Sequence, residues 1–139
     1  MTRPAQADDI AALCSLDPVA QAGEAERRTA ISAHVAAGHV LVAVADGDVA
    51  GYVVMLPGHF LGRDFIELLV VATNHHKMGL ATGLIALALD GATGRRVFTS
   101  TNASNTPMKA LLQQRGWTFS GTLDGFDAGD PEEFYYFDV

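Results

Sequence analysis

Residues 70–89, VVATNHHKMGLATGLIALAL, constrain the fold more than any other part of this sequence. The apolar, β-branched run over residues 65–73 predicts a buried strand, and the nearly all-apolar run over residues 78–89 predicts a buried helix. A polar turn joins the two runs, and Gly79 opens the helix. The segment therefore predicts a strand–turn–helix junction of the kind found in α/β domains.

The start of this helix is a candidate anion-binding site. The first N–H groups of a helix have no partner within it, and the helix dipole favours a phosphate there. Gly79 would let a ligand touch the backbone, and Ala81 is also small. The glycine could instead only relieve a tight turn. The sequence contains no GxxxxGKS/T, GxGxxG or GxSxG, which excludes a P-loop, a Rossmann fingerprint and a hydrolase nucleophile elbow.

The other patterns predict alternating strands and helices. Pro18 is expected to break the first helix, and Pro57 and Gly58 are expected to end the second hairpin strand. Helices are predicted up to about residue 16 and over residues 22–37, 78–89 and 106–114. Strands are predicted at the start of the chain, on both sides of residues 46–48, and over residues 65–73, 95–101, 117–123 and 132–139. The order β-α-α-β-β-β-α-β-α-β-β predicts an α/β (α+β) fold with a mixed, mostly antiparallel sheet flanked by helices.

Composition and charge restrict the function. The 139 residues are 49% hydrophobic and 18% charged, which fits one globular domain over residues 1–139. The net charge of −7 disfavours nucleic acid and anionic membranes as partners. No apolar leader opens the sequence and residues 78–89 are too few to span a bilayer, so a cytoplasmic protein is expected. Cys14 is expected to be a buried, inert thiol, and His75 and His76 lack the spacing of metal ligands, so no metal is expected.

The junction resembles the acyl-CoA pyrophosphate loop of the GCN5-related N-acetyltransferase (GNAT) family. That motif has a valine, an Arg or Gln five residues later, a glycine three residues after that, and then Gly or Ala two residues on. Val71, His76, Gly79 and Ala81 occupy these positions here.

A second signature of the family is also similar. It consists of an asparagine, a helix and a glycine followed by an aromatic residue, as in Asn105, residues 106–114 and Gly116-Trp117. The opening residues and the order of elements match as well, so the resemblance covers nearly the whole chain and implies a GNAT fold.

The resemblance implies that the protein binds acetyl-CoA as a co-substrate and transfers its acetyl group to an amine. Backbone amides of the loop would hold the pyrophosphate, and the backbone of the preceding strand would hold the pantetheine and polarise the thioester carbonyl. Asn105 could touch the pantetheine or could equally be a helix cap. The implied acetyl-CoA-binding residues are Leu69, Val70, Val71, His76, Lys77, Met78, Gly79, Leu80, Ala81 and Asn105.

Two positions depart from the family pattern. His76 stands where the family usually has Arg or Gln, although the backbone amides would still face the pyrophosphate. Leu112 stands where many members carry a tyrosine that protonates the departing CoA thiolate. A thiol has a pKa of about 8.5 and an alkylammonium about 10.4, so the thiolate can leave with water as its proton source, whereas the amine must first lose a proton.

Glu67 is the candidate base for that proton. It interrupts the apolar strand and shares a face with Leu69 and Val71, because strand side chains alternate. The alternative is a structural ion pair with Arg63 or another cation. In the family, many relatives place a glutamate at this position near the amine. Burial on this face is expected to suit the carboxylate to general-base work, directly or through a water.

The resulting hypothesis is an acetyl-CoA-dependent N-acetyltransferase acting on a primary amine of a small molecule or peptide. The alternatives are a non-catalytic acyl-CoA-binding domain, favoured by the missing tyrosine, and an interaction module with a decayed pocket. A homodimer would be compatible with the sequence. Residues 124–133 are expected to form an acidic loop, either a solvated turn or an attractor for a cationic acceptor.

Overall fold

The structure, a computed structural model, describes residues 1–72 and 77–139. The strands are β1 (Thr2–Pro4), β2 (Val40–Ala45), β3 (Asp48–Phe60), β4 (Arg63–Val71), β5 (Arg96–Asn102), β6 (Thr118–Asp127) and β7 (Asp130–Asp138). The helices are η1 (Ala7–Asp9), a 3₁₀ helix, and α1 (Ile10–Leu16), α2 (Pro18–Gln21), α3 (Ala25–Ala36), α4 (Lys77–Asp90) and α5 (Thr106–Gln114).

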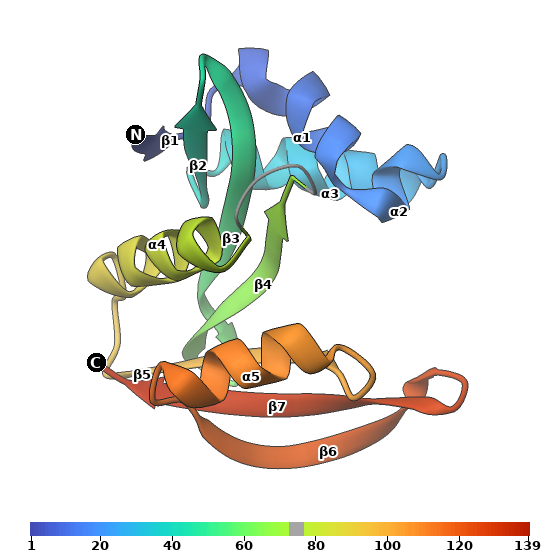
Figure 1. The fold of residues 1–139 in the computed structure, drawn as a ribbon, viewed down its shortest axis with the longest axis vertical. Coiled ribbons are helices and arrows are strands. Elements are labelled where there is room, and N and C mark those ends of the chain that lie inside the picture. Colours follow the sequence, from blue (N-terminus) through green and yellow to red (C-terminus); the bar gives the residue numbers. More distant parts are fainter. Residues whose placement is uncertain (73–76) are drawn as a thin grey trace. The chain divides into compact units, whose positions relative to one another are not determined.

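The strands form a 7-stranded sheet in the order β1-β2-β3-β4-β5-β7-β6 (Figure 1). β4 and β5 are parallel, whereas β1 with β2, β2 with β3, β5 with β7 and β6 with β7 are antiparallel. The predicted fold class, a mixed and mostly antiparallel sheet flanked by helices, is confirmed. The chain divides into two compact units, and β3 and β4 each contribute to both. Unit 1 comprises Met1–Met55 and Leu68–Asp90, and unit 2 comprises Leu56–Glu67 and Gly91–Val139.

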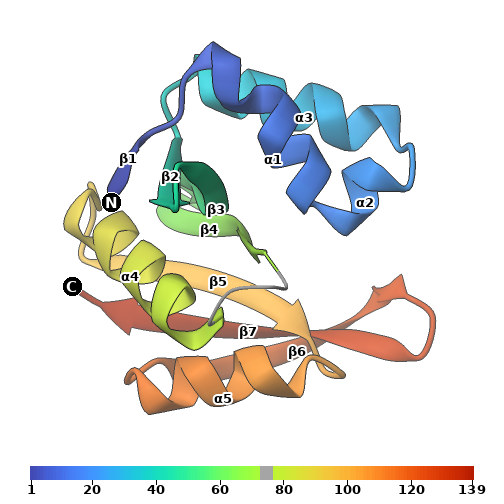
Figure 2. The same ribbon diagram turned by 45° about the horizontal axis from the view of Figure 1, so that its top comes forward.

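In unit 1, helices cover both faces of the strands. α1, α2 and α3 lie on one side of β2 and β3, and α4 lies on the other (Figure 2). The turn between β2 and β3 has positive φ at Asp46 (53°) and Gly47 (83°), as a two-residue hairpin requires. The core of this unit includes Leu13, Ile31, Val42, Val54 and Leu84, each fully buried.

A buried carboxylate connects three elements of unit 1. Asp17, 1% exposed, accepts hydrogen bonds from Arg27 Nη1 (2.7 Å), Tyr52 Oη (3.2 Å) and the Val19 amide (2.9 Å). Burial and the neighbouring carboxylate raise the pKa of Tyr52, which keeps its phenol protonated as a donor. The break expected at Pro18 is confirmed, because α1 ends at Leu16 and Asp17 is extended. The short helix α2, which Asp17 caps and which begins with Pro18, was not predicted.

In unit 2, α5 lies along one face of β5, β7 and β6 (Figures 1 and 2). Asn105 accepts from the Met108 amide (3.3 Å) as the N-cap, and Pro107 lies in the first turn, so the helix spans the predicted residues. Leu111 and Leu112 form its buried stripe. The parallel register of β4 with β5 runs from Asp64↔Val97 to Ile66↔Thr99 and ends before either strand ends.

Two boundaries predicted in this unit are wrong. β3 does not end at Pro57-Gly58 but continues to Phe60, because Gly58 adopts a φ of 64° and its amide donates to Asp64 (3.0 Å) instead of needing a strand partner. The acidic loop expected over residues 124–133 is largely hairpin, since β6 reaches Asp127 and β7 begins at Asp130.

Candidate functional site

Gly79 lies in the first turn of α4 with its Cα exposed to solvent. A Cβ placed on it would meet no described atom within 4 Å, and its φ is not positive. Neither packing among the described residues nor backbone conformation therefore requires glycine, which disfavours a helix by about 1 kcal/mol relative to alanine. The opposite side of α4 is anchored in unit 1 by Ala81, Leu84, Ile85 and Ala88, all buried.

Gly51 holds β3 close to β4 and α4. A Cβ at Gly51 would lie 3.0 Å from the carbonyl oxygen of Val70, 3.3 Å from Leu84 Cδ1 and 3.4 Å from Val71 Cγ2. A larger residue would therefore displace the part of β4 that was predicted to hold the pantetheine. The sequence analysis missed this residue, although a glycine inside an apolar strand run is a recognised sign of close backbone approach.

The structure describes some of the other residues predicted to bind acetyl-CoA but not all of them. Leu69, Val70 and Val71 are half-buried at the end of β4, and Leu80 is half-buried on α4. His76 lies outside the described residues, as do the side chains of Lys77 and Met78. For Asn105, the structure shows the helix cap in unit 2, one of the two roles expected for it.

Glu67 lies on β4 with 40% of its side chain exposed, so the expected burial is wrong. Among the described residues, the basic side chain next to its carboxylate is that of His59, whose Nε2 lies 3.9 Å from Oε2, and not Arg63, which donates to the carbonyl of Leu61 (3.4 Å). The physical reason is its place along β4: Glu67 comes directly after Ile66, the last residue of the β4–β5 register, whereas Phe65 on the same side lies within the paired part and is buried.

Asp64 is the buried carboxylate of the same strand, 1% exposed. It accepts hydrogen bonds from the amides of Gly58 (3.0 Å), Thr93 (2.7 Å) and Gly94 (3.3 Å), and from Thr93 Oγ1 (2.7 Å). Burial alone would raise the pKa of Asp64, but these four hydrogen bonds together lower it. Asp64 was not predicted from the sequence, because most of its donors come from Thr93 and Gly94, on the far side of α4 along the chain.

The acidic residues at the end of the β6–β7 hairpin are engaged by neighbours. Asn102 Nδ2 donates to Asp127 (2.9 Å), Ser104 Oγ donates to Asp130 (2.6 Å), and Lys109 pairs with Glu133 (3.3 Å). These contacts favour a structural role for that segment over an open, solvated loop.

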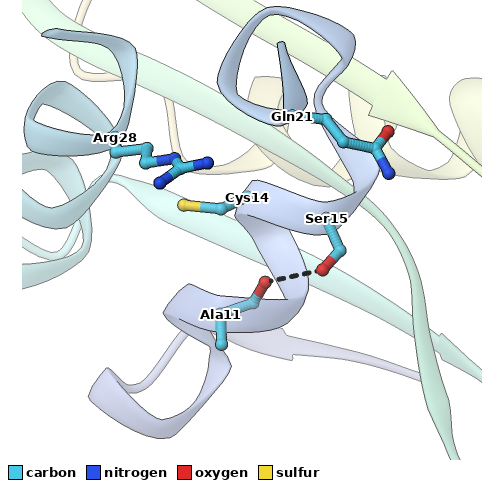
Figure 3. A pocket seen from close by; sticks show the side chains of 5 residues that line it. All are labelled: Ala11, Cys14, Ser15, Gln21 and Arg28. Carbon is cyan, nitrogen blue, oxygen red and sulfur yellow. Dashed lines mark hydrogen bonds between the residues drawn. The ribbon is translucent and has the colours of Figure 1, made fainter. Parts of the chain in front are cut away.

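A hollow of about 300 Å³ lies among α1, α2 and α3 of unit 1 (Figure 3). Its lining residues are Ala11, Cys14, Ser15, Gln21 and Arg28. Cys14 is half-buried there and not fully enclosed as expected. The hollow contains none of the residues predicted to bind acetyl-CoA.

Within residues 1–72 and 77–139, no group of three His, Cys, Asp or Glu side chains could hold a metal, and no helix is long and apolar enough to cross a bilayer.

Comparison with known proteins identifies the family. The sequence profile described as the acetyltransferase (GNAT) family matches residues 7–117. The chain belongs to the GNAT family.

Solved structures of GNAT acetyltransferases share this fold. A GNAT family acetyltransferase from Bacillus cereus is 25% identical, with 99% of this chain and 96% of that chain covered and a TM-score of 0.90. The protein yncA from Salmonella typhimurium, solved with its cofactor acetyl-CoA, is 20% identical over 99% and 92% of the chains (TM-score 0.78). A ribosomal-protein-alanine N-acetyltransferase from Brucella melitensis is 22% identical over 100% and 99% (TM-score 0.75). No curated protein matches the chain at a significant level.

Leu112, the residue predicted to stand where many relatives carry a tyrosine, is fully buried within unit 2.

Proposed function

We propose that this protein is an acetyl-CoA-dependent N-acetyltransferase that acetylates a primary amine of a small molecule or peptide. Membership of the GNAT family supports the reaction class, and yncA, a structural neighbour, was solved with acetyl-CoA. The observation that carries the proposal in this chain is Gly79, a glycine that neither φ nor packing against the described residues explains, in the first turn of a firmly anchored helix. The family match includes parts of both units, which supports one domain over residues 1–139. The proposed place of work is the cytoplasm, where acetyl-CoA is available.

In this proposal the backbone amides of residues 76–81 bind the pyrophosphate at the positive end of α4. Gly79 keeps that backbone accessible, and Lys77 adds a positive charge. The end of β4 binds the pantetheine, with Leu69, Val70 and Val71 supplying backbone groups, and Asn105 remains a candidate contact.

The chemistry is direct transfer. The amine nitrogen attacks the acetyl carbonyl, the new C–N bond forms, the C–S bond breaks, and CoA leaves as the thiolate. Glu67 accepts the proton that the ammonium must lose, directly or through a water. Because a thiolate is a stable leaving group near neutral pH, the reaction does not depend on a phenol at the position of Leu112.

A matched pair of glycine variants tests the proposal. Gly79 and Gly83 both lie in α4, both are exposed, and a Cβ on either meets no described atom within 4 Å. Valine therefore costs the helix a similar amount at either position. We expect Gly79→Val to abolish acetyl-CoA binding in calorimetry and Gly83→Val to preserve it. Folded Gly79→Val protein that binds acetyl-CoA normally would contradict the pyrophosphate site.

A turnover assay separates the enzyme from a non-catalytic acyl-CoA-binding domain. Thiol release from acetyl-CoA, measured against a panel of amines, should exceed the rate without amine. Tight acetyl-CoA binding with no amine-dependent thiol release from any member of the panel would favour the non-catalytic alternative.

A further inference from the structure

Five aromatic rings form one surface of unit 2, here called the aromatic face. Its members are Phe60, Phe65, Phe98, Phe134 and Tyr136. The ring of Phe60 is central, with its centroid 5.1 Å from that of Phe65, 5.2 Å from Phe98 and 5.6 Å from Phe134. Phe65 is buried, and the other four are only half-buried. Parts of the rings of Phe60, Phe98 and Phe134 are therefore available to a flat apolar ligand, whereas the ring of Tyr136 already has Arg96 against it.

The aromatic face lies on the side of the unit 2 sheet opposite α5. Phe98 stands between the buried residues Val97 and Thr99 of β5, whose side chains alternate with it. Val97 is paired with Phe137, and Phe137 contacts Trp117, three residues after the end of α5. Within the described part of unit 2, the only long helix is on that other side.

Carboxylates border the rings. The β5–β7 register places Ser100 opposite Phe134 and Asn102 opposite Glu132, and Ser100 Oγ donates to Glu132 Oε2 (2.8 Å). Glu67 follows Phe65 by two residues on β4 and so lies on the same side of the sheet. The proposed base is therefore next to the aromatic face and not among the phosphate-binding residues.

A cation already occupies one ring of this face. The guanidinium carbon of Arg96 lies 4.0 Å from the ring centroid of Tyr136. Arg96 is neutralised by Asp138, with Nε 2.6 Å from Oδ1. This contact is a cation–π interaction at the edge of the aromatic face, with a carboxylate beside the cation.

We infer that the acceptor amine carries a flat apolar group, such as an aryl ring a few bonds from the nitrogen, and that this group binds on the aromatic face. The inference rests on the proposed acetyltransferase function. The rings exclude water from the apolar group, while Glu67 and Glu132 attract the ammonium and repel acceptors that carry a carboxylate. Highly hydroxylated or polycationic amines would leave the rings covered by polar groups and are poor substrates.

Three amines test this assignment at saturating acetyl-CoA. They are 2-phenylethylamine, ethylamine, which lacks the ring, and 4-(2-aminoethyl)benzoate, which adds a negative charge to it. We expect kcat/KM for 2-phenylethylamine to exceed that for ethylamine by about 10-fold or more, as burial of part of a phenyl group predicts. The benzoate should fall well below 2-phenylethylamine.

A matched pair of variants locates the effect. Phe134→Leu should reduce the preference for 2-phenylethylamine over ethylamine, because it should lower kcat/KM for 2-phenylethylamine more than kcat/KM for ethylamine. Phe119→Leu changes an exposed phenylalanine of β6 that is not part of the aromatic face, so it should leave the preference intact. Calorimetry with CoA-loaded protein compares the binding of 2-phenylethylamine and ethylamine without any reaction. It therefore tests the inference even if none of the three amines is acetylated.

The outcomes distinguish this inference from the proposed function. Equal kcat/KM and equal binding for 2-phenylethylamine and ethylamine, with acetyl-CoA bound, would overturn the aromatic acceptor and leave the acetyltransferase proposal standing. Failure to bind acetyl-CoA would overturn both. A dimer in sedimentation analysis that dissociates in Phe134→Leu, together with no binding of 2-phenylethylamine, would show that a second copy covers the face and would also overturn the inference.

Discussion

Asp64 and Glu67 lie three residues apart on β4, and their surroundings are opposites. Asp64 is 1% exposed and accepts four hydrogen bonds from Gly58, Thr93 and Gly94. Glu67 is 40% exposed, and the basic side chain next to it among the described residues is His59, 3.9 Å away. One carboxylate is saturated by the protein itself, and the other remains accessible to a substrate.

The difference shows how one strand serves both stability and chemistry. A buried carboxylate is tolerated only when its lone pairs are satisfied, and once satisfied it links the segments that donate to it. A carboxylate that is to accept a proton from a substrate must instead have room for that substrate. On β4, alternation of side chains separates the two roles onto opposite sides of the sheet.

The largest expected effect comes from changing Asp64, the buried carboxylate of the pair. Asp64→Asn keeps the shape of the side chain but turns an NH₂ group toward donors and removes the charge. We expect a loss of about 3 kcal/mol in the free energy of unfolding, measured by urea denaturation. Asp48→Asn, at the exposed start of β3, is the control and should change stability by less than about 0.5 kcal/mol. A loss below about 1 kcal/mol for Asp64→Asn would show that the four hydrogen bonds do not support unit 2.

The second-largest expected effect is on catalysis and comes from changing Glu67, the accessible carboxylate of the pair. Glu67→Gln should lower kcat by about 100-fold, the usual size of a lost general base, and leave acetyl-CoA affinity nearly unchanged. Its free energy of unfolding should match that of the wild type, because the residue is exposed. Glu26→Gln, an exposed glutamate of α3, is the control and should retain full kcat. A wild-type kcat in Glu67→Gln across the pH range would remove Glu67 from the mechanism.

The smallest effect is a pH dependence that sharpens the contrast. The hydrogen bonds outweigh burial and hold the pKa of Asp64 below its usual value in the folded state. Its contribution to stability is therefore present above the unfolded pKa of about 3.9 and is lost as pH falls through the lower, folded value. The stability difference between wild type and Asp64→Asn should narrow steadily in urea unfolding below about pH 4. A difference that stays constant with acidification would contradict the assigned charge state of Asp64.

Local signals in the sequence were sufficient for much of the fold. The helix at residues 106–114 was predicted with correct bounds because its cap Asn105, its first-turn Pro107 and its following Gly116 act within a few residues of it. The hairpin at Asp46-Gly47 was predicted for the same reason. The assignments of Glu67 as base and of residues 76–81 as the pyrophosphate loop stay predictions, resting on family resemblance.

Other features could not be obtained from neighbours along the chain. Pro57-Gly58 looks like a strand end, but β3 continues because Asp64 supplies an acceptor for the Gly58 amide. The acidic residues after Leu123 look like a loop, yet Asn102, Ser104 and Lys109 hold them in place from other elements.

The sequence by itself determined the order of the strands and the longer helices, the cap at Asn105, the turn at Asp46-Gly47 and the resemblance to the family. The tertiary structure alone decided which carboxylate of β4 is buried and which is accessible, and it assembled the aromatic face from β3, β4, β5 and β7. The physical reason is the distance along the chain over which each interaction acts. Capping and turn preferences act between residues a few positions apart. Burial and hydrogen-bond satisfaction depend on segments as far apart as Asp64 and Thr93, which only the folded chain brings together.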